Sequence, residues 1–227
     1  MITTLHPKKR KFFFFLLPIL LIALFFSFGC TKQVDYFSYV SELRDNVLLC
    51  ENGEFQLRVY ATRKESPYSL DGIKRDMQTR AEIFLIAPSI EKTRSLSFTV
   101  DGKTYQGEFS ADNVKMQYYF ACEANLSALE SLQVSVTCEN QQTEFTAVSV
   151  RTANTLSPQE ALSCICQSES ELINAMTDKY GFAGEIYLRL LYEDFPYYYV
   201  GIIDRSGKTH AFLLNGETGE TLAKREI

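Results

Sequence analysis

Apolar and polar positions follow four patterns along this chain of 227 residues. Residues 12–28 are almost continuously apolar, and residues 46–151 alternate between apolar and polar. From residue 157 to about 180 the apolar positions recur at helical spacing, and alternation returns over 185–224. Alternation is typical of strands with one buried face, whereas spacing of three and four residues is typical of amphipathic helices. The pattern therefore predicts a mainly β chain with a helical segment in its second half.

The alternating region predicts a sandwich of two antiparallel sheets. Its short strand-like segments are separated by turn sequences such as Glu51-Asn52-Gly53 and Asp101-Gly102-Lys103, and one long polar loop at 65–78 interrupts them. The segments that place apolar residues on one face are 54–61, 94–100, 103–109, 117–122, 132–138 and 144–150. This spacing of short strands is typical of an immunoglobulin-like β-sandwich, which we expect over residues 46–151.

The second half predicts a helix that covers an antiparallel sheet. Ser157 as N-cap, Pro158 at the first helical position and Glu160 at the third form a capping box, and one or two helical segments are expected to reach about Gly181. Strands are expected at 185–192, 197–204, 210–215 and 221–224, with glycine-containing turns at 204–207 and 215–219. This order predicts a small α+β module over residues 152–227.

The first residues of the chain combine a basic run with the apolar stretch. Residues 8–11 are all basic, as in nuclear-import or nucleic-acid-binding segments, but a basic run followed by an apolar core and small residues is typical of a secretory signal. A helix over 12–28, at about 1.5 Å per residue, spans about 26 Å, short of the ~30 Å hydrocarbon core of a bilayer. We expect a cleaved leader, with an uncleaved N-terminal anchor as the alternative.

The four residues Ser27-Phe28-Gly29-Cys30 resemble the lipobox of bacterial lipoproteins. In that family a diacylglycerol is attached to the cysteine thiol and the chain is cut just before it. The resemblance implies that residues 1–29 are a signal peptide cut between Gly29 and Cys30, and that Cys30 carries acyl chains such as palmitate. It places the protein outside the cytoplasm, held by lipid at the outer face of the cytoplasmic membrane.

A short tether is expected between Cys30 and the folded part. Phe37, Val40 and Leu43 recur every three residues, so residues 30–45 are predicted to hold the lipidated cysteine and a short amphipathic helix. The protein would then lie close to its membrane.

A second resemblance covers about the last 70 residues. Residues 157–162, a Tyr-Val strand at 199–200 and the closing sequence from Asn215 to Leu222 resemble a PepSY domain. The resemblance implies a PepSY-like α+β fold outside the cytoplasm, in a family whose domains are proposed to bind or restrain peptidases. It implies no catalysis by the module itself.

Charge and composition exclude several classes of partner. The chain has a formal net charge of −5, and it is more acidic still without the basic run of the leader. Acidic proteins are poor ligands for nucleic acid or for anionic lipid surfaces. We therefore expect no nucleic-acid partner, and a membrane contact that depends on the lipid of Cys30.

Few residues of this sequence are candidates for catalysis or metal binding. After the leader the sequence holds one histidine, His210, through which any Ser-His-Asp or Cys-His mechanism would have to run. One histidine without a Cys-x-x-Cys pair does not supply a zinc site, and phosphate-binding or dinucleotide-binding motifs are absent. The sequence predicts a non-catalytic protein with no cofactor and no metal. The alternative is a hydrolase built on dispersed carboxylates, such as Glu169 with Glu171 or Glu217 with Glu220.

Two groups of residues are candidates for partner binding. In the strand at 197–204, Tyr197 and Tyr199 share one face while Tyr198 takes the other, so one face buries rings under the helix and the other offers aromatic surface to a peptide or protein. Ordinary packing is the alternative. The second group lies in or beside the long polar loop, and comprises Arg63, Tyr68 and Asp71; the alternative is a solvated loop held by one anchored tyrosine.

Five cysteines follow Cys30, so at least one is free or pairs between chains. Cys122 and Cys138 each end a strand-like segment, and we consider a disulfide between neighbouring strands at this pair. Cys164 and Cys166 are expected to be small buried hydrophobic residues of the helix.

Three functions are compatible with these observations. The first is a non-catalytic lipoprotein that binds or regulates a peptidase or another envelope protein. The second is a structural spacer in an envelope complex, and the third is the carboxylate hydrolase. A large exposed aromatic patch would favour the first over the second.

Overall fold

A computed structural model describes residues 34–67 and 73–227, and most of this part of the chain is β-strand. The predictions for the leader, Gly29, Cys30, Tyr68 and Asp71 lie outside the described residues. Residues Asp35–Ile227 form one compact unit. Among the described residues no helix is long and apolar enough to cross a membrane.

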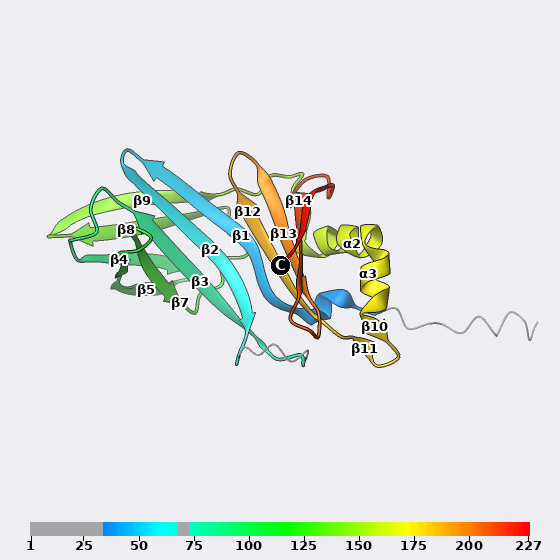
Figure 1. Cartoon of the computed structure of the whole chain (residues 1–227). Helices are drawn as coiled ribbons and strands as arrows, with labels where there is room; N and C mark the ends of the chain where they lie inside the picture. The colour runs from blue at the N-terminus through cyan, green and yellow to red at the C-terminus, as the bar shows by residue number, and fades with distance from the viewer. Residues whose placement is uncertain (1–33, 68–72) are drawn as a thin grey trace, which may run out of the picture. The chain divides into compact units, whose positions relative to one another are not determined.

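The first half of the fold contains a short 3-10 helix followed by nine strands (Figure 1). These elements are η1 (Tyr36–Tyr39), β1 (Val40–Asn52), β2 (Phe55–Glu65), β3 (Met77–Ile86), β4 (Arg94–Val100), β5 (Lys103–Glu108), β6 (Ser110–Asp112), β7 (Gln117–Cys122), β8 (Ser131–Cys138) and β9 (Gln141–Ser149).

The second half contains two helices and six strands. They are α2 (Pro158–Ser168), α3 (Ser170–Ala175), β10 (Thr177–Asp178), β11 (Gly181–Phe182), β12 (Glu185–Tyr192), β13 (Pro196–Ile203), β14 (Thr209–Asn215) and β15 (Thr221–Glu226). The mainly β prediction is confirmed.

Strand β1 joins the two halves through one shared edge. Its residues Val40–Arg44 pair in parallel with β12, while Leu48 and Leu49 pair antiparallel with β9. Its other edge pairs with β2, with a register shift between Arg44 and Asn46. The long sheet therefore runs β15-β14-β13-β12-β1-β2-β3-β7-β6, and β9-β8-β4-β5 continues from β1 as a second layer.

A hydrophobic core lies between the long sheet and this second layer. Alternate residues of β2, including Leu57 and Val59, meet alternate residues of β8 and β9, including Val134 and Phe145, and all four are at most 1% exposed. Burial of every second residue is what the alternation in the sequence predicts.

Helices α2 and α3 lie beside strands β12–β14 (Figure 1). The predicted capping box is present: Ser157 Oγ accepts the Glu160 N–H at 3.3 Å, and Glu160 Oε2 accepts the Ser157 N–H at 2.7 Å. Ala161, Leu162 and Ile165 of α2 are buried against the sheet, as a helix that covers one sheet face requires. The four strands expected after the helix are also confirmed.

Two local predictions are wrong, and one strand was not predicted. Residues 40–45 are not helical but form the start of β1, because β12 and β2 supply hydrogen-bond partners on both edges. Gly181 does not end a helix: α3 ends at Ala175, and Gly181 pairs with Asp178 in the β10–β11 hairpin. The sequence pattern also missed strand β3.

The disulfide considered between Cys122 and Cys138 is absent. All five described cysteines are free thiols, Cys122 and Cys138 among them. Cys122 ends β7, which pairs with β3 and β6, whereas Cys138 ends β8, which pairs with β4 and β9. A disulfide here requires β7 and β8 to be neighbouring strands, and they are not.

Candidate functional site

One face of the long sheet is covered and the other is not. Leu57, Val59 and Ala61 of β2 face the core, so the residues between them face away. Cross-strand partners share a face, which extends the outward face onto β1, β3, β7, β12 and β13, where no described helix or strand covers it. We call this surface the tyrosine–arginine face, and it comprises Glu42, Arg44, Arg58, Tyr60, Lys64, Arg80, Glu82, Phe84, Tyr119, Tyr187, Arg189, Tyr197 and Tyr199.

Three aromatic rings form a row across β2, β3 and β7 on this face. The ring centroids of Tyr60 and Phe84 are 5.3 Å apart, and those of Phe84 and Tyr119 are 5.1 Å apart. The Arg44 guanidinium lies 3.9 Å from the centroid of Tyr60, and Arg80 Nη2 donates to Tyr119 Oη at 3.0 Å. The three rings are half-buried, so each is held by its neighbours and still presents surface to solvent.

Glu42 lies at the centre of the face and binds Arg189 through both carboxylate oxygens. Arg189 Nε and Nη2 donate to Glu42 Oε1 and Oε2 at 2.7 and 2.8 Å, and Lys64 Nζ lies 3.7 Å from Oε2. Burial alone would raise the pKa of Glu42, but the hydrogen bond and charge of Arg189, with Lys64 and Arg44, hold this pKa below its ordinary value. Glu42 is therefore ionised at neutral pH and fixes the orientation of Arg189.

Arg189 in turn orders the tyrosines of β12 and β13. Its guanidinium carbon lies 5.2 Å from the ring centroid of Tyr187 and 5.7 Å from that of Tyr199. Near the start of β13, the ring of Tyr197 lies against that of Phe195, with centroids 4.0 Å apart and the ring planes tilted by 38°. The predicted alternation of Tyr197, Tyr198 and Tyr199 is confirmed: Tyr198 is fully buried under the helices, and its two neighbours are half-buried on the opposite face. Their role in binding stays a prediction.

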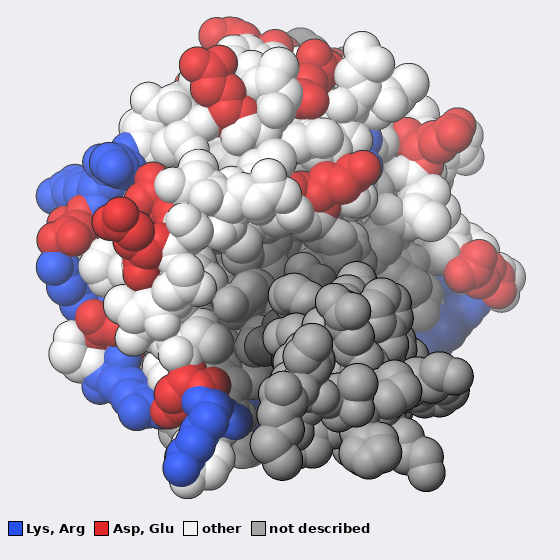
Figure 2. Space-filling view, turned by 90° about the vertical axis from the view of Figure 1, so that its right-hand side faces the viewer, with Lys and Arg blue, Asp and Glu red and all other residues white. Residues whose placement is uncertain are grey.

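The charge of this face differs from that of the whole chain. Its cations are Arg44, Arg58, Lys64, Arg80 and Arg189, and its central anions are Glu42 and Glu82, although the chain is acidic overall. Further carboxylates lie at its edges, where Glu51 pairs with Gln56 next to Arg58, and Glu193 and Asp194 lie near Tyr197. On the side that carries α2 and α3, acidic side chains spread over the upper part and Lys and Arg gather along the left edge (Figure 2). The uneven distribution makes the tyrosine–arginine face suited to an acidic partner.

Arg63, a predicted binding residue, does not lie on this face. It is the cross-strand partner of Leu43 on the covered side, and its Nη2 donates to Asp45 Oδ2 at 3.1 Å. The structure therefore separates Arg63 from Tyr197 and Tyr199.

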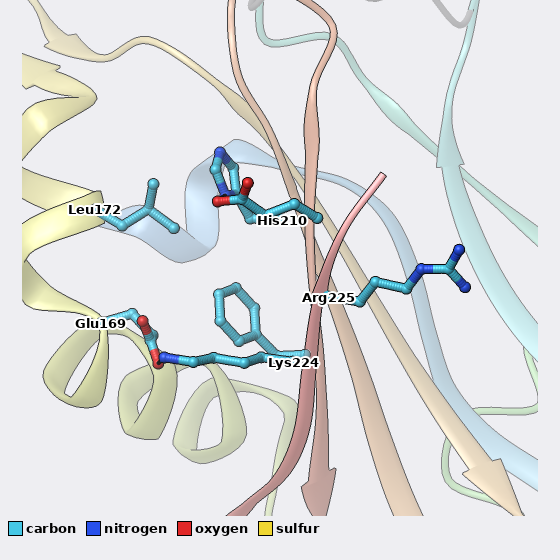
Figure 3. A pocket seen from close by; sticks show the side chains of 7 residues that line it. Glu169, Leu172, His210, Lys224 and Arg225 are labelled. Carbon is cyan, nitrogen blue, oxygen red and sulfur yellow. Dashed lines mark ion pairs between the residues drawn. The ribbon is translucent and has the colours of Figure 1, made fainter.

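A pocket of about 340 Å³ between α3 and strands β14–β15 is a second candidate site (Figure 3). His210 lies in it, with Nδ1 3.5 Å from Glu226 Oε1 and Nε2 3.8 Å from Asp204 Oδ2. Glu169 and Lys224 form an ion pair at 3.6 Å, and Leu172 projects from the helix toward His210 (Figure 3). Arg225 points away from the pocket (Figure 3).

The pocket offers acid–base groups without a nucleophile. Its described lining consists of Glu169, Leu172, His210, Phe212, Lys224, Arg225 and Glu226, none of which is serine, threonine or cysteine. Over residues 34–67 and 73–227 no group of three or more His, Cys, Asp or Glu side chains is arranged to hold a metal ion. The pocket can bind a small polar group, but its residues do not assemble a hydrolytic triad.

Sequence reasoning missed the residues at the centre of the tyrosine–arginine face. Glu42 and Arg189 are 147 positions apart, and only the parallel pairing of β1 with β12 brings them together. A signal was present in β2, where Arg58, Tyr60 and Lys64 occupy the outward positions. Large aromatic and basic residues at outward positions of a strand indicate a surface that binds a partner.

Comparison with models of known protein families, with curated proteins and with solved structures finds no match to this chain.

Proposed function

We propose that this protein is a non-catalytic lipoprotein of the bacterial cell surface that binds an acidic segment of an envelope protein through the tyrosine–arginine face. Acyl chains on Cys30 would hold it at the outer face of the cytoplasmic membrane. A peptidase is one class of partner that the PepSY-like sequence of the second half suggests.

The observation that carries this proposal is the composition of the uncovered face. Tyrosine and arginine are the residues most enriched where protein–protein interfaces concentrate their binding energy. Here Arg189 is held by Glu42 and flanked by Tyr187 and Tyr199, so these side chains are ordered before a partner arrives. Preorganised side chains lose less conformational entropy on binding.

The same face favours recognition over a spacer role. A spacer needs only a polar, hydrated surface, whereas half-buried aromatic rings such as Tyr60, Phe84 and Tyr119 lie next to one another on this face. A contiguous aromatic surface on a monomer is most often a binding surface.

Two finer assignments of fold belong to the proposal. The two layers around the core of the first half support an immunoglobulin-like sandwich, and the capped helix packed on β12–β13 supports a PepSY-like module. Strand β1 would then serve both, because it pairs with β12 at one end and with β9 at the other.

Charge reversal on the face tests the binding proposal. Arg58 and Arg80 are exposed, so the double variant Arg58→Glu/Arg80→Glu should fold and should repel an acidic partner. The charge-matched control is Lys103→Glu/Lys115→Glu, on exposed residues of β5 and of the β6–β7 turn. Crosslinking in intact cells should capture one defined envelope protein with wild type and control, and at least about tenfold less with the face variant. Equal capture by all three proteins would refute the assignment of this face.

The anchor is tested separately by Cys30→Ser. Loss of the thiol should leave a chain of higher mass, with the leader retained and without acyl chains. If the wild-type and Cys30→Ser proteins have the same processed form and the same detergent partitioning, Cys30 carries no lipid.

A further inference from the structure

The end of the molecule at which the described chain begins carries two strongly exposed apolar side chains. Tyr180, in the turn between β10 and β11, is 84% exposed, and Ile73, at the end of the loop before β3, is 61% exposed. Neither side chain is needed for the core, so their position on the molecule is informative.

Both residues lie beside the helix η1. The rings of Tyr36 and Tyr39 pack edge-on against Phe182, with centroids 5.6 and 5.4 Å apart, and Tyr39 Oη accepts the Phe182 N–H at 3.2 Å. On the other side Lys74 Nζ lies 3.8 Å from the ring centroid of Tyr39. Figure 1 shows η1 and the β10–β11 hairpin at the same end of the fold.

The length of the tether places this end at a membrane. Four residues lie between Cys30 and Asp35, the last residue before η1, so the five Cα–Cα steps reach only about 17 Å even when fully extended. We infer that η1, the β10–β11 turn and residues 73–74 contact the surface of the lipid bilayer, with Tyr180 at the level of the headgroups. This inference rests on the proposed lipid anchor.

Exposure alone does not select this end, because Val114 at the far end is 94% exposed. Val40, Glu65 and Met77 are the ends of β1, β2 and β3 that lie near η1, and the opposite ends of these strands lie at the β1–β2 turn. Strand β7 begins beside Ile86, at that opposite end of β3, so Val114 in the turn before β7 also lies there. The 13 residues of β1 span about 40 Å at ~3.3 Å per residue, beyond the reach of the tether.

The chemistry of the contact is aromatic rather than electrostatic. Lys179 lies over the ring of Tyr180 at 4.8 Å, and Arg205 pairs with Asp178 at 3.8 Å, so cations and anions alternate around the turn. A tyrosine with an apolar ring and a polar tip is suited to the interface between lipid and water. The contact should therefore not require anionic lipid.

The chain contains no tryptophan, so one introduced tryptophan is a unique reporter. We would reconstitute the full chain in phosphatidylcholine vesicles as Tyr180→Trp and, as the matched control, as Val114→Trp. The emission of Tyr180→Trp should shift to shorter wavelength and be quenched by brominated phosphatidylcholine at least about twofold more than that of Val114→Trp. Adding phosphatidylglycerol should not change the result.

Equal quenching of the two reporters would overturn the inference, and quenching that appears only with phosphatidylglycerol would overturn its aromatic basis. The outcome is separable from the anchor itself, because an uncleaved leader would also hold the chain on vesicles. The mass of the purified chain reports the lipid on Cys30. Quenching of Tyr180→Trp in a chain without that lipid would refute the lipoprotein proposal and leave the membrane contact standing.

Discussion

Glu42 and Arg189 are the residues that fix the centre of the tyrosine–arginine face. The Glu42 side chain is 11% exposed and the Arg189 side chain 32% exposed, and two hydrogen bonds join them. Removing the charge of one member leaves the other partly buried and poorly paired, which costs more than the pair contributes.

Replacement of Glu42 by glutamine should lower the free energy of unfolding at neutral pH by about 1–3 kcal/mol, because Arg189 keeps a neutral acceptor but loses its counter-charge. Denaturant titration measures the change. The control is Glu139→Gln, which removes a pair with Lys92 that is more than half exposed on both sides and should change stability little. An equal loss in both variants would contradict a special role for Glu42.

Acid should act through the same residue. The pKa of Glu42 lies below its ordinary value of 4.5 in the folded chain, so its contribution to stability is complete above pH 4.5 and is lost as the pH falls through the folded pKa. The wild-type protein should therefore lose its stability advantage over Glu42→Gln in acid. If the difference in free energy of unfolding between wild type and Glu42→Gln stays constant from pH 7 to about pH 3, this linkage is wrong.

Burial makes Cys166 a poor nucleophile. Desolvation raises the pKa of its thiol from 9.0 to about 11, so the folded chain should hold about 100-fold less Cys166 thiolate at pH 8 than the unfolded chain. Iodoacetamide should label Cys166 far more slowly before unfolding than after it, as peptide mass spectrometry can follow. Rapid labelling of the folded protein would show that this thiol of α2 is not buried.

At the level of elements, regular alternation was enough to predict most strands, and interrupted alternation was not. β4 and β7 have the bounds that the sequence indicates, and Tyr197 and Tyr199 face as predicted. β1 escaped prediction because its buried positions include Glu42, Asp45 and Asn46, and its register shift reverses the alternation midway. The partners of Glu42, Asp45 and Asn46 include groups distant in sequence, namely Arg189, Arg63 and the carbonyls of Leu126 and Leu129, which a local pattern does not reveal.

The β14–β15 turn packs closely against helix α2 at Gly219. A Cβ at this position would collide with Cys164 Sγ and approach Leu156 Cδ1 to 3.2 Å, and Gly219 has φ +72°. Gly207 has a similar φ of +85° with open space around it, so it is a matched control. Gly207→Ala should cost about 1 kcal/mol of stability from backbone strain alone, and Gly219→Ala about 2–4 kcal/mol because it adds a clash. Equal melting temperatures would show that the turn does not pack on the helix.

At the level of the whole molecule, shared use of β1 should make the two halves unfold together. Val40–Arg44 contribute hydrogen bonds to β12 while Leu48 and Leu49 contribute them to β9, within one compact unit. Calorimetry should give one transition whose calorimetric and van't Hoff enthalpies agree. Two separated transitions would show that the two halves of the chain are independent domains despite the shared strand.

The account also assigns an orientation to the molecule. With Cys30 lipidated as we propose, the short tether would hold η1 at the membrane, and the tyrosine–arginine face would extend across the strands that lead away from it. A partner anchored in the same membrane would meet this face side-on, so the two contacts do not compete.

Site-specific photo-crosslinking in intact cells can show whether a partner binds the tyrosine–arginine face. A photoreactive amino acid at Tyr199 or Tyr119 on this face should crosslink to the same envelope protein. The same group at Gln133, which is exposed on the outer side of the second layer, should not. Crosslinking of that protein from Gln133 alone, or with equal yield from all three positions, would contradict the account.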